Sequence, residues 1–168
     1  MTMAEDRYEQ VLEEIRTALA GEDGLANAVA LLQARLPHYT WVGFYRLERN
    51  ELVLGPWRGP AATEHVRIPL GEGICGAAAA SGKTELVDDV VADGRYLACF
   101  PSTRSEIVVP VRRGDRVLGE LDVDSDRPAA FGPADLTLLE RVAALIASDC
   151  RRWSLLAENK TKEYDVNK

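Results

Sequence analysis

The sequence predicts an α+β fold in which helices from both ends of the chain pack on one face of a central antiparallel sheet. Two observations lead to this prediction. Apolar residues recur at helical spacing near both ends, and the middle contains short β-branched and aromatic segments joined by turns. With 168 residues, of which 46% are hydrophobic, the chain is long enough for one compact domain with its own core.

Helical patterning is clearest at the two ends of the chain. Residues 4–20 and 25–36 repeat apolar side chains at helical spacing, and Pro37 ends the second of these helices. Residues 131–153 predict a closing helix with Pro133 in its first turn. The buried stripe of this helix comprises Leu136, Leu139, Val142, Ala143 and Ile146.

The middle of the chain has the composition of strands. Strands are expected at residues 39–47, 51–57, 66–70, 105–113 and 116–124. Turn signals at residues 49–50 and 114–115 join the first two and the last two of these strands into antiparallel hairpins. A glycine loop and a short alanine-rich helix are expected over residues 71–82. Residues 87–105 show little periodicity, and long irregular segments inside a compact domain are often functional.

Composition and charge restrict the domain organisation and the partners. We predict a single domain over residues 1–168, with a core over about 22–153 and a polar tail over 154–168. The net charge of −7 and the scattered lysines and arginines argue against a nucleic-acid partner. No apolar run reaches the roughly 20 residues that span a bilayer, and the first residues carry no secretion signal. A cytoplasmic protein without a membrane segment is therefore expected.

Neither a metal nor another cofactor is expected. His38 and His65 do not have the spacing of a metal site, and the three cysteines lack a C-x-x-C pair. Gly71, Gly73 and Gly76 spell G-x-G-x-x-G, but a dinucleotide site requires a parallel βαβ unit, whereas the flanking segments are hairpins. We interpret these glycines as a tight turn from a strand into a helix.

Alternation through residues 116–124 predicts one apolar and one acidic face of a strand. The apolar face carries Val117, Gly119, Leu121 and Val123, and the acidic face carries Leu118, Glu120, Asp122 and Asp124. With a three-residue turn, Glu106 of the preceding strand lies across from Asp122. Such clustering raises the pKa of at least one carboxyl unless a cation or a ligand ammonium lies among them, which indicates a candidate site. A solvated outer sheet face fits the same pattern, and the residues alone leave both interpretations open.

Two cysteines are candidates for chemistry. Cys99 is the preferred nucleophile because it lies in the irregular segment shortly before Glu106, where a protonated carboxyl could supply an acid. Cys75 lies just inside the N-terminus of the short helix, where the helix dipole favours a thiolate, and is a candidate resolving thiol. Burial as an inert thiol is the alternative for both. Cys150 falls on the stripe of the closing helix and is interpreted as structural.

An ordered set of motifs extends from about Thr40 to Ile146. It comprises TWVGFY, LVLGPW, VRIPLGEGICGAA, LAC, SEIVVPV, VLGELDVDS and the F-x-x-x-D-x-x-x-L-E pattern of the closing helix. These motifs resemble the free methionine-(R)-sulfoxide reductases, a family of GAF domains. The resemblance implies reduction of the R epimer of free methionine sulfoxide by a cysteine, through a sulfenic acid and a disulfide that a thioredoxin-like partner reduces. It also implies a homodimer.

The resemblance assigns roles to individual residues. Cys99 matches the thiol that attacks the sulfoxide sulfur, and Cys75 matches a further cysteine of the family. The acids that hold the substrate amine and protonate the sulfoxide oxygen match Glu106, Asp122 and Asp124. The aromatic residues that receive the methyl group and the sulfur match Trp41 and Tyr45.

Three positions depart from the family pattern. His65 stands where the family's usual resolving cysteine lies, while Arg95 and Phe100 replace a histidine and an aspartate near the nucleophile. Cys75 could substitute as the resolving thiol, or a thiol reductant could attack the sulfenic acid directly. These departures sustain a second hypothesis, a non-catalytic GAF module that binds a small amine or amino acid as a sensor.

Overall fold

A computed structural model describes residues 2–149 of the chain. Its helices are α1 (Met3–Leu19), α2 (Gly24–Arg35), α3 (Gly73–Ser81) and α4 (Pro133–Ser148). Its strands are β1 (Trp41–Glu48), β2 (Glu51–Arg58), β3 (Arg67–Pro69), β4 (Glu85–Val87), β5 (Ser105–Arg113) and β6 (Arg116–Ser125). Cys150 and the predicted tail lie outside the described residues. Within the described part, no helix combines the length and the hydropathy needed to cross a membrane.

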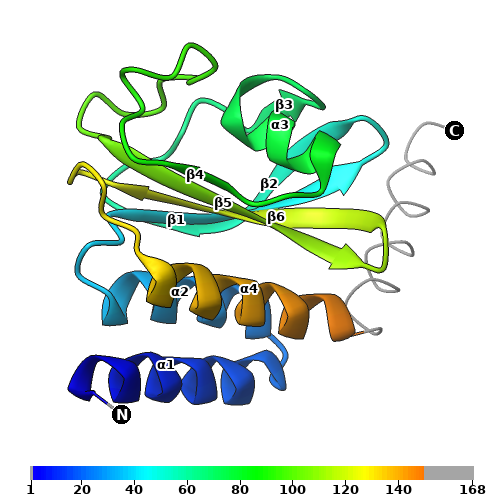
Figure 1. Ribbon diagram of the computed structural model, residues 1–168. Helices are drawn as coiled ribbons and strands as arrows, with labels where there is room; N and C mark the ends of the chain where they lie inside the picture. Colours follow the sequence, from blue (N-terminus) through cyan, green and yellow to red (C-terminus); the bar gives the residue numbers. More distant parts are fainter. Residues whose placement is uncertain (1, 150–168) are drawn as a thin grey trace, which may run out of the picture.

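The strands form one antiparallel sheet in the order β3-β2-β1-β6-β5-β4. Because β1 lies beside β6, the two halves of the chain meet at the centre of the sheet. Helices α2 and α4 cover one face, and α1 packs on these two helices as a further layer (Figure 1). The predicted α+β class, with the terminal helices on one side of an antiparallel sheet, is confirmed. Helix α3 and the segment 88–104 lie over the opposite face (Figure 1).

A hydrogen-bonded hub at Asp135 joins α1, the loop before β1 and α4. Tyr8 and Tyr39 each donate a hydroxyl proton to Oδ1 of Asp135 over 2.9 Å, and Nε2 of His38 lies 2.7 Å from the same oxygen. The backbone N–H of Gly132 donates to Oδ2 over 2.8 Å. Burial alone would raise the pKa of Asp135, but the hydrogen bonds from His38, Gly132 and Tyr8 outweigh it and lower that pKa. His38 therefore has a structural role.

The hairpin of β5 and β6 differs from the predicted register. Glu106 lies opposite Asp124, and Asp122 lies opposite Val108. A two-residue turn closes the hairpin between Arg113 and Arg116, and a bulge inserts Leu118 as an unpaired residue. The bulge also exchanges two side chains between the faces, because Leu118 joins the helix-covered core and Val117 packs on the other face. Beyond the bulge, the predicted acidic face is retained.

Candidate active site

Four carboxylates occupy the face of the sheet beneath α3. Glu106 comes from β5, and Glu120, Asp122 and Asp124 come from β6. Their exposed fractions are 5%, 0%, 2% and 2%, respectively. The interpretation of this face as a solvated outer surface is therefore wrong, because α3 and the segment 88–104 cover it.

The four carboxylates have no cationic partner among the described residues, since none of the ion pairs there includes any of them. Both side-chain oxygens of Glu120, together with Oδ1 of Asp122 and Oδ1 of Asp124, are buried without a hydrogen-bond partner. Isolated negative charge in such a place is costly. The arrangement calls either for protons on the carboxyls or for a cation supplied by a ligand.

Burial and mutual repulsion determine the protonation of this cluster. Burial first, and then the neighbouring Asp122, raise the pKa of Glu106, Glu120 and Asp124 well above the usual range. Burial also raises the pKa of Asp122, but interactions with Glu106 and Cys75 oppose that effect. Asp122 is thus the member best suited to carry the negative charge, and Glu106 is suited to remain a neutral acid.

Cys75 lies in the first turn of α3, directly over the carboxylates. Its thiol is 6% exposed and donates to Oε1 of Glu106 over 3.7 Å. Burial raises the pKa of the Cys75 thiol well above its usual value, and Asp122, Glu120 and Glu106 raise it further. The expectation that the helix dipole produces a thiolate here is wrong, because desolvation and the nearby acids outweigh the dipole.

Cys99 lies in the segment that covers the cluster. Its thiol is partly buried and donates to the carbonyl oxygen of Leu97 over 3.5 Å. Burial raises the pKa of the Cys99 thiol to about 12, and Asp122 contributes to the increase, while a hydrogen bond with Thr63 opposes it. The charge of Cys99 also contributes to the raised pKa of Glu106. The structure therefore brings Cys75 into contact with Glu106, and it brings Cys99 close enough to Asp122 and Asp124 for their charges to raise its pKa.

Aromatic side chains line the β1 side of the cluster. Trp41 and Tyr45 lie opposite Asp124 and Glu120 in the β1–β6 ladder, and the Tyr45 hydroxyl donates to the His65 carbonyl over 2.8 Å. The indole of Trp41 stacks on Trp57, with ring centroids 6.2 Å apart. Its Nε1–H is buried without an acceptor.

Two glycines fix the position of the Trp41 indole. A Cβ atom at Gly43 would lie 2.2 Å from Cη2 of that ring, and a Cβ at Gly59 would lie 2.3 Å from Cδ1. Phe100 packs against the same ring, with centroids 5.9 Å apart, and thereby connects the Cys99 segment to β1. The Trp41 indole is thus confined by the backbone at Gly43 and Gly59 and by Phe100 of the segment that covers the cluster.

Sequence reasoning did not assign a role to several residues of this region. Glu120 was placed on the acidic face but not among the candidate site residues, although the alternation that identified Asp122 and Asp124 also includes it. Phe100 stands among the departures from the family pattern, but its contact with Trp41, like that of Trp57 with Trp41 and that of Thr63 with Cys99, depends on how separate segments fold together. No local pattern identifies such residues in advance.

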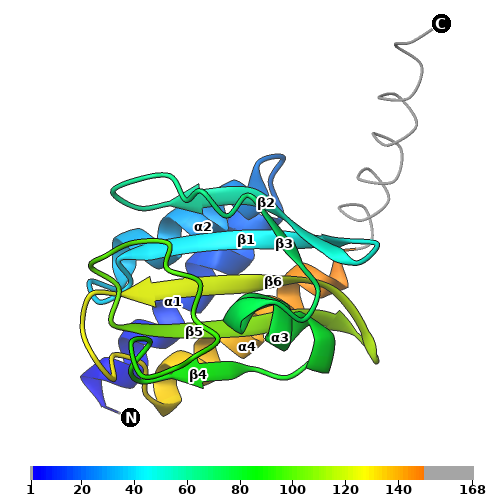
Figure 2. The ribbon, with the colours of Figure 1, turned by 90° about the horizontal axis from the view of Figure 1, so that it is seen from above.

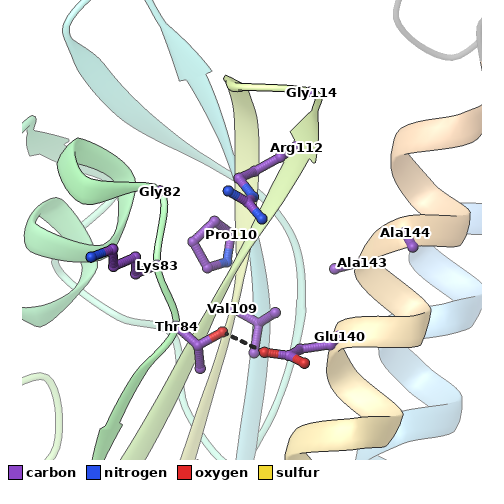
Figure 3. Close-up of a pocket in the computed structure, with 10 residues that line it drawn as sticks. All are labelled: Gly82, Lys83, Thr84, Val109, Pro110, Arg112, Gly114, Glu140, Ala143 and Ala144. Atoms are coloured by element: carbon purple, nitrogen blue, oxygen red, sulfur yellow. Dashed lines mark hydrogen bonds between the residues drawn. The ribbon is translucent and has the colours of Figure 1, made fainter.

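The surface also carries a hollow of about 710 Å³ at the edge of the sheet, which contains none of the predicted site residues. Residues 82–84, β5 and α4 line it (Figure 3). In that hollow Thr84 donates its hydroxyl proton to Glu140 over 3.1 Å. The hollow and the carboxylate cluster are separate features.

Comparison with known proteins shows similarity along most of the chain. The profile of the GAF domain family matches residues 4–149. The free methionine-R-sulfoxide reductase of Escherichia coli is 38% identical over 141 residues, which cover 82% of this chain and 84% of that protein.

Solved structures give the same result. The free methionine-R-sulfoxide reductase of Neisseria meningitidis, in complex with its substrate, is 38% identical with a TM-score of 0.80 and covers 88% of this chain and 90% of its own. The type II free methionine-R-sulfoxide reductase of Thermoplasma acidophilum is 42% identical with a TM-score of 0.71 and covers 82% and 92%, respectively.

Proposed function

The chain belongs to the free methionine-(R)-sulfoxide reductase family of GAF domains, and we propose that it reduces the R epimer of free methionine sulfoxide to methionine, with Cys99 as the nucleophile. The observation that carries the proposal is that four carboxylates are enclosed near the Cys99 thiol. Within the described part of the chain, no cationic side chain pairs with them. A free amino acid brings the ammonium group that this enclosure lacks, whereas a methionine within a peptide does not.

Substrate binding follows from the unsatisfied groups of the site. The ammonium group binds the oxygens of Asp122 and Asp124 that have no partner, and binding it restores the charge of Asp124, which burial keeps protonated. The methyl group and the sulfur lie against Trp41 and Tyr45, whose rings are fully buried. Ligand binding thus replaces carboxyl protons by an ammonium group and places the apolar end of the substrate against the aromatic rings.

The reducing step needs a nucleophile and an acid. The sulfur of Cys99 attacks the sulfoxide sulfur and forms an S–S bond, the thiol proton passes to an ionised carboxylate of the cluster, and Glu106 donates a proton to the sulfoxide oxygen. Glu106 can donate because burial and Asp122 raise its pKa and keep it neutral. The hydroxyl then passes from the substrate sulfur to the Cys99 sulfur, so the S–O bond of the substrate and the transient S–S bond both break, which leaves a sulfenic acid on Cys99 and releases methionine. The substrate sulfur gains the two electrons that the cysteine sulfur loses.

Cys75 completes the cycle in our proposal. Its thiol attacks the sulfenic sulfur of Cys99, water leaves, and a disulfide forms. A thioredoxin-like dithiol then reduces this disulfide. Position 65 offers only an imidazole, and the two free cysteines among the described residues are Cys75 and Cys99. A thioredoxin-type reductant, a homodimer and a cytoplasmic location stay predictions.

Matched cysteine variants test the mechanism. Methionine formation from the separate R and S epimers is measured with thioredoxin and then with dithiothreitol, for the wild type, Cys99→Ser and Cys75→Ser. We expect Cys99→Ser to be inactive with both reductants, and Cys75→Ser to lose activity with thioredoxin but keep part of it with dithiothreitol. Unchanged activity of Cys99→Ser would remove Cys99 from the mechanism.

The sensor hypothesis predicts a different outcome. A non-catalytic module would bind free methionine or its sulfoxide with no turnover by the wild type under either reductant. Calorimetric titration of Cys99→Ser with the sulfoxide measures binding separately from chemistry. Turnover by the wild type would exclude this alternative.

A further inference from the structure

Three potential metal ligands meet above the centre of the sheet. The sulfur of Cys75 and one carboxylate oxygen each from Glu106 and Asp122 all lie within 4.8 Å of one another. The three residues come from α3, β5 and β6, and Figure 2 shows α3 lying across these two strands. All three are buried. The three residues lie far apart in the sequence, so no local spacing indicates this cluster.

We propose that Cys75, Glu106 and Asp122 bind a thiophilic divalent cation, with Zn²⁺ as the preferred ion, and that the bound ion excludes the substrate. The inhibitory part of this inference rests on the proposed function, because it requires that the substrate ammonium group uses the same carboxylates. The binding part stands on the cluster alone.

The donor set favours zinc over harder ions. Zn²⁺ takes thiolate and carboxylate ligands in tetrahedral geometry, at about 2.3 Å for sulfur and 2.0–2.2 Å for oxygen, whereas Mg²⁺ and Ca²⁺ prefer oxygen ligands. These bond lengths place tetrahedral ligands roughly 3.5 Å apart. Cys75 Sγ and Glu106 Oε1 are already 3.7 Å apart, and no pair of the three atoms has to approach by more than about 1.3 Å. Side-chain rotation of a cysteine and two acids is sufficient for such a contraction.

Glu120 provides a second, independent observation. It is 0% exposed, and neither of its carboxylate oxygens has a hydrogen-bond partner. Glu120 lies two residues before Asp122 on the same face of β6, and after burial and Asp122, which raise its pKa, the Cys75 thiol is the group that lowers it. A buried carboxylate with two unused oxygens is costly unless something binds it. We assign Glu120 as the fourth ligand.

Occupancy by the cation would stop the reaction in two ways. Binding displaces the protons of the Cys75 thiol and of the neutral carboxyls among the ligands to solvent and forms a metal–sulfur bond, so this sulfur can no longer attack the sulfenic acid. It also places a cation among the carboxylates, where the substrate ammonium group would otherwise bind. The site therefore accepts either the inorganic cation or the substrate amine.

Cobalt substitution tests the site without any activity measurement. Co²⁺ is added to the reduced protein, and the thiolate-to-cobalt charge-transfer band in the near ultraviolet is recorded. The double variant Cys99→Ser/Cys150→Ser retains Cys75 as its one thiol and should show the band at a stoichiometry of one ion per chain. Cys75→Ser should lack it, and Zn²⁺ should displace the cobalt from the wild type.

Glu120→Gln keeps the test independent of Cys75→Ser, which could fold poorly. We expect Glu120→Gln to bind Co²⁺ at least tenfold more weakly with the band still present. A band that persists in Cys75→Ser, or is absent from the double variant, would overturn the inference. Equal affinity of Glu120→Gln and the wild type would remove Glu120 from the ligand set.

Inhibition distinguishes the two proposals. If both hold, Zn²⁺ inhibits sulfoxide reduction competitively with the substrate, and a chelator restores the activity. A cobalt band in a protein without reductase activity under chelator would refute the proposed function and leave the cation site intact. Reductase activity without a band at one ion per chain would refute the cation site alone.

Discussion

Replacing Glu120 by glutamine should change how the stability of the protein depends on pH. The folded protein keeps this carboxyl protonated because burial raises its pKa well above 4.5, whereas the unfolded chain releases the proton near that value. The stabilising contribution of the raised pKa is therefore complete below pH 4.5 and is lost as the pH rises towards the folded-state pKa. Glutamine has no proton to release, so this part of the pH dependence disappears in the variant.

The size of the effect follows from one proton. Each proton bound by the folded state alone lowers the free energy of unfolding by about 1.4 kcal/mol per pH unit. Between about pH 5 and pH 6 the unfolded chain has already lost most of this proton, so the wild type should lose up to about 1.2 kcal/mol more than Glu120→Gln. Glutamine resembles the neutral carboxyl in size, which limits other changes in packing.

Urea unfolding at these two pH values measures the difference. Glu22→Gln, at an exposed position in the turn before α2, makes the same chemical change and should follow the wild type. If the free energies of unfolding of the wild type and Glu120→Gln fall in parallel, Glu120 is ionised in the folded protein. The conclusion that Glu120 is protonated in the folded protein would then be wrong.

Three further variants test the packing around the site. Gly59→Ala places a Cβ 2.3 Å from the Trp41 ring, so it should lower the free energy of unfolding by about 1–3 kcal/mol in thermal unfolding and raise KM. The control is Gly94→Ala, whose Cβ meets no atom within 4 Å and which should leave both quantities unchanged. Asp135→Ala removes the shared acceptor of two tyrosines and a histidine and should cost about 2–4 kcal/mol in urea unfolding; a loss below about 0.5 kcal/mol would contradict the hub. Phe100→Ala removes an aromatic contact of about 0.5–1.5 kcal/mol and should raise KM more than it lowers Tm, and an unchanged KM would show that the covering segment does not need this contact.

The sequence predicted the acidic face and the elements other than the three-residue strand β4, because these features depend on short-range periodicity and β4 is too short to show any. Alternation placed Asp122 and Asp124 on one side of a strand, and that remains correct beyond the bulge. The register was not predictable, because the bulge at Leu118 adds one residue to a hairpin whose turn is one residue shorter than expected. The two errors cancel as far as the faces are concerned, so Asp122 and Asp124 remain on the predicted face of β6. The residue opposite Glu106 is Asp124 instead of the predicted Asp122.

The burial of the acidic face and the protonation of its carboxyls and of the Cys75 thiol could not be predicted from the sequence. Whether a strand face is wet or dry depends on what folds over it, and here the cover comes from α3 and an irregular segment without periodicity. The thiol of Cys75 illustrates the consequence. Its position at a helix N-terminus is visible in the sequence, but the acids that reverse the effect of the dipole come from two distant strands.

The adjacency of β1 and β6 at the centre of the sheet has a consequence for synthesis of the protein. Translation produces Cys75 and Cys99 before β6, and in the finished fold burial, followed by the charges of Asp122 and Asp124 in β6, raises the pKa of both thiols. A nascent chain that has not yet paired β6 with β1 therefore exposes two ordinary cysteines to cellular oxidants. The interval before that long-range pairing closes is the period in which a newly made molecule is most easily damaged.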